Sequence, residues 1–511
     1  MLARIKTVGL MGMDGFIAEV QADISAGMPS VEIIGLPDAA VKESKERVKT
    51  AIKNSDCKFP TKHVTVNLAP AATKKEGAGY DFPISVAILA ASGQIDISNC
   101  ADAVFVGELS LDGKITSVPG VLPMVISAFK AGYKKIFVPE ANAQEAAVVE
   151  GAEIYPVESL SQLIKYLAGA DNIKCPSIDI EEYFKKIDET VLDFADVKGQ
   201  ESVKRALEIA AAGNHNVLLI GSPGTGKTML AQRMTGILPD MTFDEALEVT
   251  KVHSIAGVLP SGTPLLKSRP FRSPHHTISS VGLSGGGTLP RPGELSLAHN
   301  GILFLDELPE FRRDVLEVLR QPLEDRQVTI SRVNATLTYP CNIMLVASMN
   351  PCKCGYFGDA NRNCTCTAAQ VLAYRSRISG PLLDRIDIQV EVSSVDYKSL
   401  SSKSRGEKSA KIKERVDRTR RIQLERYKEY TGIFSNSQLT AGMIQKFCPL
   451  TEEADNVLKA AFDSLGFTAR AHSRILKVAR TIADMDGCAV IQKEHIAEAI
   501  QYRSLDRKYF A

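Results

Sequence analysis

No run of apolar residues in this 511-residue sequence is long enough to cross a membrane as a helix. The longest run, residues 82–91, falls well short of the roughly 20 residues that such a helix needs. The first residues also lack a long apolar segment followed by a cleavage site of small residues. We therefore expect a cytoplasmic protein without a membrane partner.

An excess of charge of one sign is missing as well, since 61 Lys and Arg face 60 Asp and Glu. Total charge therefore predicts neither a nucleic acid nor an acidic membrane as partner, and only local clusters can. Ten cysteines are too few for a disulfide scaffold in a chain of this length. The length and the 44% apolar content predict two to four globular domains.

The hydrophobic patterns divide the chain into three folded regions and a linker. Residues 1–170 alternate strand-like and helical patterns, which predicts an α/β domain, and residues 171–196 are a polar linker. Residues 197–396 contain strand–loop–helix patterns and most of the glycine, which predicts an α/β core. Residues 397–511 have helical periodicity and predict a C-terminal helical region.

A phosphate-binding loop is predicted where an apolar strand at 216–220 is followed by a helix at 229–234. The loop consists of Gly221, Ser222, Pro223, Gly224, Thr225, Gly226, Lys227 and Thr228. Its glycines allow backbone N–H groups to face the phosphates, and the next helix begins with a partial positive charge. Lys227 should reach the β- and γ-phosphates, and Thr228 should place its hydroxyl on Mg²⁺.

Two further strands should end beside this loop. The run 302–305 reads as a buried parallel strand and ends in Asp306 and Glu307. We expect Asp306 to hold Mg²⁺ and Glu307 to polarise the attacking water. Asn350 follows the buried strand 343–348 and can orient that water, although an Asn before a proline is also typical of a simple turn.

Four cysteines in two close pairs indicate a metal site. Cys352, Cys354, Cys364 and Cys366 follow the pattern C-x-C-x₉-C-x-C, which suits a tetrahedral structural Zn²⁺. The pairs are closer than the commoner C-x₂-C spacing, and four free thiols or a redox pair remain alternatives.

Several runs carry a family resemblance. Residues 194–228 resemble the opening of an AAA+ ATPase module, and residues 293–308 and 379–392 resemble magnesium chelatase and MCM-type modules. The segments FRSPHHT (271–277), NPCKCGYFGD (350–359) and TARAHSRILKVARTIAD (468–484) are similar to the ComM family of magnesium chelatase-like proteins. The resemblance covers nearly the whole chain. It implies an ATP-dependent AAA+ P-loop core, a C-terminal helical lid and a hexameric ring.

The resemblance also implies roles for two arginines. Arg385 matches the arginine finger that a subunit inserts into its neighbour's site, where it stabilises developing phosphate charge. An ion pair with Asp384 or Asp387 is the simpler alternative for this side chain. Arg470 matches the second sensor of the lid, and Arg474 is the substitute one helical turn later.

Three segments are candidates for substrate contact. The run 326–340 alternates like a β-hairpin with Arg332 at its turn, and in MCM-like rings such a hairpin points into the pore. Arg332 would follow DNA phosphates without reading sequence, or is simply exposed. Residues 243–293 resemble a helix-two insert. The basic run 403–428 is either a DNA-binding face or a solvated helix face.

The N-terminal runs 64–93 and 106–145 resemble the Lon-protease-like fold. Lon-type proteolysis needs a serine nucleophile that a lysine activates. The matching positions are Asp81 and Leu122, so we expect a catalytically dead domain.

The resemblance as a whole implies a hexameric, ATP-driven DNA motor with helicase and branch-migration activity in homologous recombination during natural transformation. Its partner would be single-stranded or branched DNA, bound independently of sequence. A chelatase-like or protein-remodelling ATPase that acts on a protein partner is the alternative. The Lon-like domain argues against a chelatase subunit, and the hairpin lacks the aromatic pore residues typical of protein remodelling.

Overall fold

The structure is a computed structural model that describes residues 2–75, 77–100, 102–185, 192–287, 290–332, 335–359, 362–394, 406–465, 467–505 and 509. The chain forms two units. The first comprises residues 1–187, 243–267 and 331–339, and the second comprises residues 188–242, 268–330 and 340–511. Among the described residues, no helix combines the length and the apolar character needed to span a membrane.

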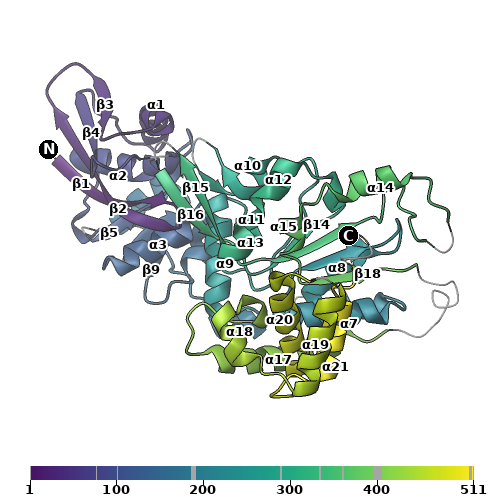
Figure 1. Ribbon diagram of the computed structural model, residues 1–511. Coiled ribbons are helices and arrows are strands. Elements are labelled where there is room, and N and C mark those ends of the chain that lie inside the picture. Colours follow the sequence, from purple (N-terminus) through teal and green to yellow (C-terminus); the bar gives the residue numbers. More distant parts are fainter. Residues whose placement is uncertain are drawn as a thin grey trace. The chain divides into compact units, whose positions relative to one another are not determined.

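A seven-stranded mixed sheet is the centre of the first unit (Figure 1). Its order is β3 (Ser30–Ile34), β4 (His63–Ala69), β2 (Asp14–Ser25), β1 (Leu2–Met11), β5 (Ala103–Phe105), β8 (Lys135–Pro139) and β9 (Glu153–Val157). Strands β1, β2 and β4 pair antiparallel, whereas β5, β8 and β9 continue from β1 in parallel. Alternate residues of β4 are buried, as expected for a strand with one face on the core.

Helices α1 (Ala39–Asn54), α2 (Asp81–Ala91) and α3 (Val121–Lys130) complete this α/β unit. Asp81 is fully buried at the start of α2, where it accepts hydrogen bonds from Ser44 and from Arg47 Nε, the latter at 2.7 Å. Leu122 lies in a buried apolar cluster at the start of α3. Neither position therefore offers the hydroxyl or the amine that Lon-type proteolysis requires.

Part of the expected helix-two insert folds as a component of this first unit. Helix α9 (Phe243–Ala256) packs against α3, and the Gly120 N–H donates to the Ser254 carbonyl oxygen at 2.9 Å. The Ser254 hydroxyl donates to Glu145 Oε2 at 2.6 Å, and Leu265 joins Leu122 in the same apolar cluster. Burial raises the pKa of Glu145 despite these hydrogen bonds, so this carboxyl group lies deep in the packed interior.

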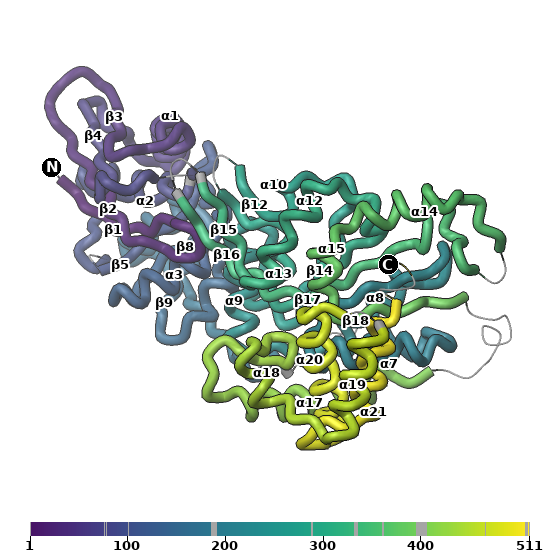
Figure 2. The backbone as a smooth tube through the Cα atoms, in the orientation of Figure 1, coloured from purple at the N-terminus to yellow at the C-terminus, as the bar shows by residue number. Residues whose placement is uncertain are grey.

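A five-stranded parallel sheet is the centre of the second unit. Its order is β11 (Phe271–Arg272), β14 (Ile302–Leu305), β17 (Met344–Met349), β10 (Val217–Ile220) and β18 (Ile388–Glu391). Figure 2 shows how segments far apart in the sequence meet in this sheet. Every residue of β10, β14 and β17 is buried, which explains why their sequences are apolar apart from Ser348 of β17.

The predicted C-terminal helical region is confirmed (Figure 1). It contains α17 (Ser409–Tyr427), α18 (Ala441–Phe447), α19 (Glu452–Leu465), α20 (Ala469–Met485) and α21 (Lys493–Gln501). Ile475, Val478, Ala479 and Ile482 of α20 are buried at helical spacing. The mixed α/β architecture with a parallel sheet and a helical C-terminal part is therefore the one that the sequence predicts.

A buried carboxylate joins α17 to α20. The Asp484 side chain is 1% exposed and accepts hydrogen bonds from Arg426 Nη1 at 2.8 Å and from Arg480 Nε at 3.1 Å. Asn436 Nδ2 donates to the same carboxylate at 2.9 Å. Burial alone would lower the pKa of Arg426, but the hydrogen bond and charge of Asp484 raise it. Removal of this one negative charge would leave the buried guanidinium of Arg480 and the partly buried one of Arg426 without their carboxylate.

We predict that Asp484→Asn destabilises the second unit by about 3–5 kcal/mol, because it breaks a buried ion pair and leaves its cations uncompensated. Thermal unfolding of the full chain by calorimetry measures this loss. Asp463→Asn is the matched control, since Asp463 is exposed on α19. Equal melting temperatures for Asp484→Asn and the control would show that the network contributes little.

Candidate functional site

The predicted phosphate-binding loop lies between β10 and α8 (Lys227–Arg233). Gly224 and Gly226 have φ values of 81° and 89°, a left-handed conformation that residues with a Cβ rarely adopt. A Cβ at Gly221 would lie 2.3 Å from the carbonyl oxygen of Val392, which follows β18. The loop therefore requires glycine at these positions, and such a conformation lets successive N–H groups face one anion.

Lys227 is buried within this loop. Its Nζ donates to the carbonyl oxygens of Gly221 at 2.7 Å and Ser222 at 3.0 Å, and to Asn350 Oδ1 at 3.1 Å. Burial lowers the pKa of Lys227, while the charges of Asp306 and Glu307 act in the opposite direction. The amine thus joins the loop directly to the residue that follows β17.

The two oxygen groups predicted to hold Mg²⁺ are in contact. The Thr228 hydroxyl donates to Asp306 Oδ2 at 2.7 Å. The Ser348 hydroxyl, at the end of β17, donates to Asp306 Oδ1 and fixes the carboxylate from the other side. A hydroxyl next to a carboxylate is an oxygen ligand set of the kind that Mg²⁺ uses together with phosphates.

Glu307 has an unusual backbone. Its φ of 54° is left-handed for a residue with a side chain, which costs about 1–3 kcal/mol. Its N–H group lies 3.1 Å from Asp306 Oδ1 and 3.3 Å from Ser348 Oγ, so these neighbours hold the strained turn. The Glu307 side chain is exposed. Strained residues of this kind are concentrated at functional sites.

The strand order brings these groups to one edge of the sheet. Strands β14, β17 and β10 are neighbours, and their carboxyl ends lead to Asp306 and Glu307, to Asn350, and to the phosphate-binding loop. Ser348 was not predicted as a site residue. Its only local signal is a small polar residue near the end of a buried apolar strand.

The four predicted metal-binding cysteines also lie together. All their Sγ atoms are within 4.8 Å of one another, and Cys352 Sγ lies 3.3 Å from Cys354 Sγ and 3.6 Å from Cys364 Sγ. Tetrahedral Zn²⁺ with bonds of about 2.3 Å would separate its sulfur ligands by about 3.8 Å. The arrangement fits a zinc ion.

Arg385 lies at the amino-terminal ends of the strands, opposite the phosphate-binding loop. It precedes β18, which pairs in parallel with β10, and its carbonyl oxygen accepts from Asn216 Nδ2 at 2.8 Å. Arg385 is therefore next to the start of β10, whereas the phosphate-binding loop follows the end of that strand. At about 3.3 Å per residue, the two are on the order of 15 Å apart.

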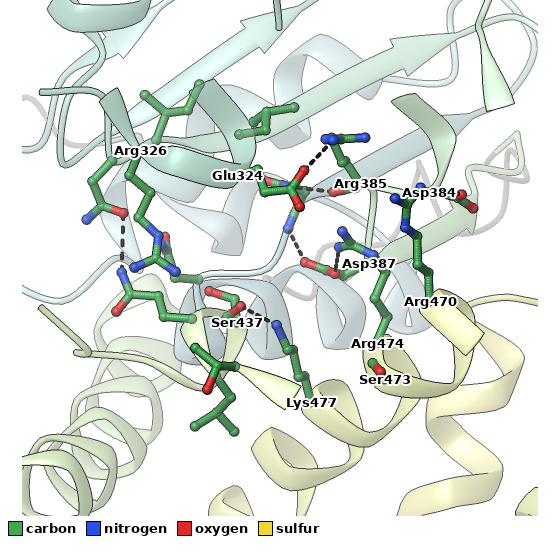
Figure 3. Close-up of a pocket in the computed structure, with 18 of the residues that line it drawn as sticks. Glu324, Arg326, Asp384, Arg385, Asp387, Ser437, Arg470, Ser473, Arg474 and Lys477 are labelled. Carbon is green, nitrogen blue, oxygen red and sulfur yellow. Dashed lines mark hydrogen bonds and ion pairs between the residues drawn. The ribbon is translucent and has the colours of Figure 1, made fainter. Parts of the chain in front are cut away.

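Arg385 and Arg470 line one pocket of about 540 Å³, together with Arg326, Arg474 and Lys477 (Figure 3). Arg470 begins α20 and its side chain is 65% exposed. The predicted arginine finger and the predicted second sensor thus share one cavity, and that cavity lies away from the phosphate-binding loop of the same chain.

Glu324 is the carboxylate that pairs with Arg385 (Figure 3). Arg385 Nε donates to the Arg320 carbonyl oxygen at 2.8 Å, and Nη1 donates to that of Pro381 at 2.7 Å. The alternative partners suggested by the sequence are used elsewhere. Asp384 lies 3.7 Å from Arg470 Nη1, and Asp387 pairs with Arg474.

Arg474 forms an ion pair with the buried carboxylate of Asp387. Burial would raise the pKa of Asp387, but the charge of Arg474 and a hydrogen bond from His215 outweigh it and hold that pKa far below its usual range. Lys477, on the same helix, has a pKa lowered to about 8, chiefly by burial. Arg470 is the more exposed of the two arginines.

Of the candidate DNA-binding segments, the structure describes the strands of the hairpin and helix α17. Strands β15 (Gln327–Arg332) and β16 (Ala335–Pro340) form a two-stranded sheet, as the hairpin prediction requires. The Arg332 side chain and the turn at 333–334 lie outside the described residues. On α17, Arg415 pairs with Glu407 at 2.7 Å, and Arg426 pairs with Asp484. These two basic side chains of α17 are therefore paired with carboxylates of the same chain.

Three family descriptions match the chain. "Magnesium chelatase, subunit ChlI" matches residues 193–400, "Subunit ChlI of Mg-chelatase" matches residues 20–142, and "Magnesium chelatase, subunit ChlI C-terminal" matches residues 406–503. A chelatase-type AAA+ module implies ATPase activity that uses ATP and Mg²⁺.

Two relatives match almost the whole chain, and a third matches part of it. Competence protein ComM of Haemophilus influenzae is 42% identical over 509 residues, which are 99% of this chain and 98% of that protein. The protein YifB of Escherichia coli has the same identity and coverage. An archaeal Lon protease of Methanocaldococcus jannaschii is 27% identical over 139 residues, which are 27% of this chain and 21% of that protein. The chain therefore belongs to the ComM family of magnesium chelatase-like AAA+ proteins.

Proposed function

We propose that this chain is an ATP-driven DNA motor that works as a hexameric ring in the cytoplasm. It would perform helicase and branch-migration steps of homologous recombination during natural transformation, on single-stranded or branched DNA of any sequence. The main observation behind the proposal is that Arg385 and Arg470 lie away from the phosphate-binding loop of their own chain. The full-length similarity to a competence protein supports this choice of process.

The residues at the carboxyl edge have distinct proposed roles. Lys227 contacts the β- and γ-phosphates, and Thr228 and Asp306 hold Mg²⁺. The bound metal would polarise phosphate oxygens and neutralise their charge. Glu307 orients the attacking water and accepts its proton, while Asn350 positions that water through its amide. Asn350 already contacts Lys227, so the γ-phosphate would lie between two groups that hold each other in place.

The basic pocket would meet the nucleotide of a neighbouring subunit. Arg385 would stabilise the negative charge that develops on the phosphates in the transition state, and Arg470 would contact the same phosphates. In the single chain, Glu324 and two carbonyl oxygens bind all the guanidinium nitrogens of Arg385. A neighbour's phosphates, which carry more negative charge than one exposed carboxylate, would replace Glu324.

We assign the regions of the chain to parts of this motor. Residues 197–396 are the ATPase core with its helix-two insert, and residues 397–511 are the helical lid. Residues 1–170 are a Lon-like domain without protease activity, and residues 171–196 are the linker. Arg332 would contact the DNA backbone from the β15–β16 hairpin, which suits binding that is independent of sequence.

The alternative is an ATPase that acts on a protein partner, as a chelatase-like or protein-remodelling motor. The chelatase descriptions that match the three regions of the chain favour this second candidate. The two functions share the ATP site and differ in what stimulates hydrolysis.

We also propose that Cys352, Cys354, Cys364 and Cys366 bind one structural Zn²⁺. Four sulfur atoms within 4.8 Å of one another form the donor set that zinc prefers, and their 3.3 Å and 3.6 Å separations are too long for disulfides.

We predict that single-stranded or branched DNA stimulates ATP turnover and that Glu307→Gln lowers turnover at least about 100-fold, because the general base is lost. A phosphate-release assay with and without each DNA measures both effects. Turnover that is indifferent to every DNA would contradict the DNA motor and favour a protein partner.

We predict that Arg385→Ala and Arg470→Ala retain ATP binding, and that Arg385→Ala lowers hydrolysis about 1,000-fold. Mixing Arg385→Ala with Lys227→Ala should restore part of the turnover, because a mixed ring joins an intact loop to an intact finger. Arg312→Ala, at an exposed arginine, is the control. A mixture as inactive as its components would place the arginine's action within its own chain.

We predict one zinc per chain in the purified protein and less than about a tenth of that in Cys364→Ser/Cys366→Ser, because two thiolates alone bind zinc weakly. Elemental analysis by mass spectrometry measures the content. Cys175→Ser, at an exposed cysteine outside the cluster, is the control and should keep its zinc. Metal-free wild-type protein that cannot be loaded with zinc would contradict the site.

A further inference from the structure

The cysteine segment, residues 350–359 and 362–366, begins where β17 ends, next to the phosphate-binding loop that follows β10. Two contacts join the segment to that loop. A Cβ at Gly355 would lie only 2.5 Å from Pro223 Cδ, so the backbone of Gly355 packs directly against the proline ring. The Ser222 hydroxyl donates to Asp359 Oδ2 at 2.6 Å. Ser222 and Pro223 are the second and third residues of the phosphate-binding loop.

The conformation of the segment depends on its cysteines. The Cys354 N–H lies 3.4 Å from Cys366 Sγ, and the Cys366 N–H lies 3.4 Å from Cys364 Sγ. Gly355 directly follows Cys354 and has a left-handed φ of 88°. The residue that contacts Pro223 is thus placed by the sulfur cluster, and so is the turn that leads to Asp359.

A second set of contacts fixes the base of the segment. Arg375 Nε donates to the Pro351 carbonyl oxygen at 2.9 Å, and its guanidinium lies 4.7 Å from the centre of the Phe357 ring. These contacts hold the segment against the core. The Phe357 contact lies between Gly355 and Asp359, so it supports this turn together with the cysteines.

A glycine-rich loop presents its N–H groups to phosphate only if its neighbours restrict it, since glycine has the greatest backbone freedom to lose. Four thiols alone attract one another weakly, whereas four thiolates on one zinc ion bind tightly. The rigidity of the surface that supports Ser222 and Pro223 should therefore change with metal occupancy.

We propose that the cysteine segment is a metal-dependent support of the phosphate-binding loop, with Asp359 as the positioning residue that acts through Ser222. Metal occupancy sets the affinity for nucleotide and takes no part in the hydrolysis step. The inference rests on the proposed function only in that the loop binds nucleotide, and it requires neither DNA nor a ring.

The test uses the full chain with Glu307→Gln, so that nucleotide stays intact, and a fluorescent ATP analogue with Mg²⁺ as the probe. Ser222→Ala and Asp359→Ala should each weaken binding about five-fold, the worth of one hydrogen bond. The double variant should bind about as weakly as either single variant, because both remove the same contact. Effects that multiply to about 25-fold would overturn the role of Asp359.

Metal dependence is tested on the same chain by removing zinc with a chelator and adding it back. Removal should weaken binding of the analogue at least about five-fold, re-addition should restore it, and Asp359→Ala should show a smaller response to zinc. Cys364→Ser/Cys366→Ser should bind like the metal-free chain, and Cys175→Ser should bind like the unaltered one.

Equal affinity with and without zinc would overturn the proposal even if the cysteine variants fail to fold, because chelation needs no substitution. A chain that shows both dependences but no stimulation by DNA would keep this inference and lose the DNA motor. Absence of any nucleotide binding would overturn both.

Discussion

The parallel pairing of five strands is the constraint on which the rest of the second unit depends. All carboxyl ends of a parallel sheet lie at one edge, so Lys227, Asp306 and Asn350 meet although they are far apart in the sequence. The same pairing places Arg385 at the amino edge, beside Asn216. One sheet thereby places the groups proposed to bind nucleotide and the arginines of the pocket at opposite ends of its strands.

Much of this site was predictable because its signals are local. The phosphate-binding loop has fixed spacing, and apolar runs that end in Asp306 or Asn350 identify buried strands by themselves. Ser348, Glu324 and Asp359 could not be predicted in the same way. Each makes its contact with a residue from another part of the chain, and no periodicity or spacing links the two partners. The pairing of α9 with α3 escaped prediction for the same reason, since it depends on packing between distant segments.

Charged residues illustrate the same difference. The basic composition of α17 is visible in the sequence. The partners of its side chains are not, because Arg415 and Arg426 pair with Glu208 and Asp484, which lie on other helices. Arg474 likewise resembles Arg470 in the sequence. Only the structure shows that buried Asp387 holds Arg474, whereas Arg470 is largely exposed.

The division of the chain into units has a consequence for its architecture. The backbone passes from one unit to the other five times, at residues 187–188, 242–243, 267–268, 330–331 and 339–340. The segments of the two units therefore alternate along the sequence, and more than one covalent connection joins the N-terminal unit to the ATPase unit. Cleavage of the linker alone would leave four covalent connections, and an excised ATPase would retain α9 without the buried cluster around Leu122 that covers it.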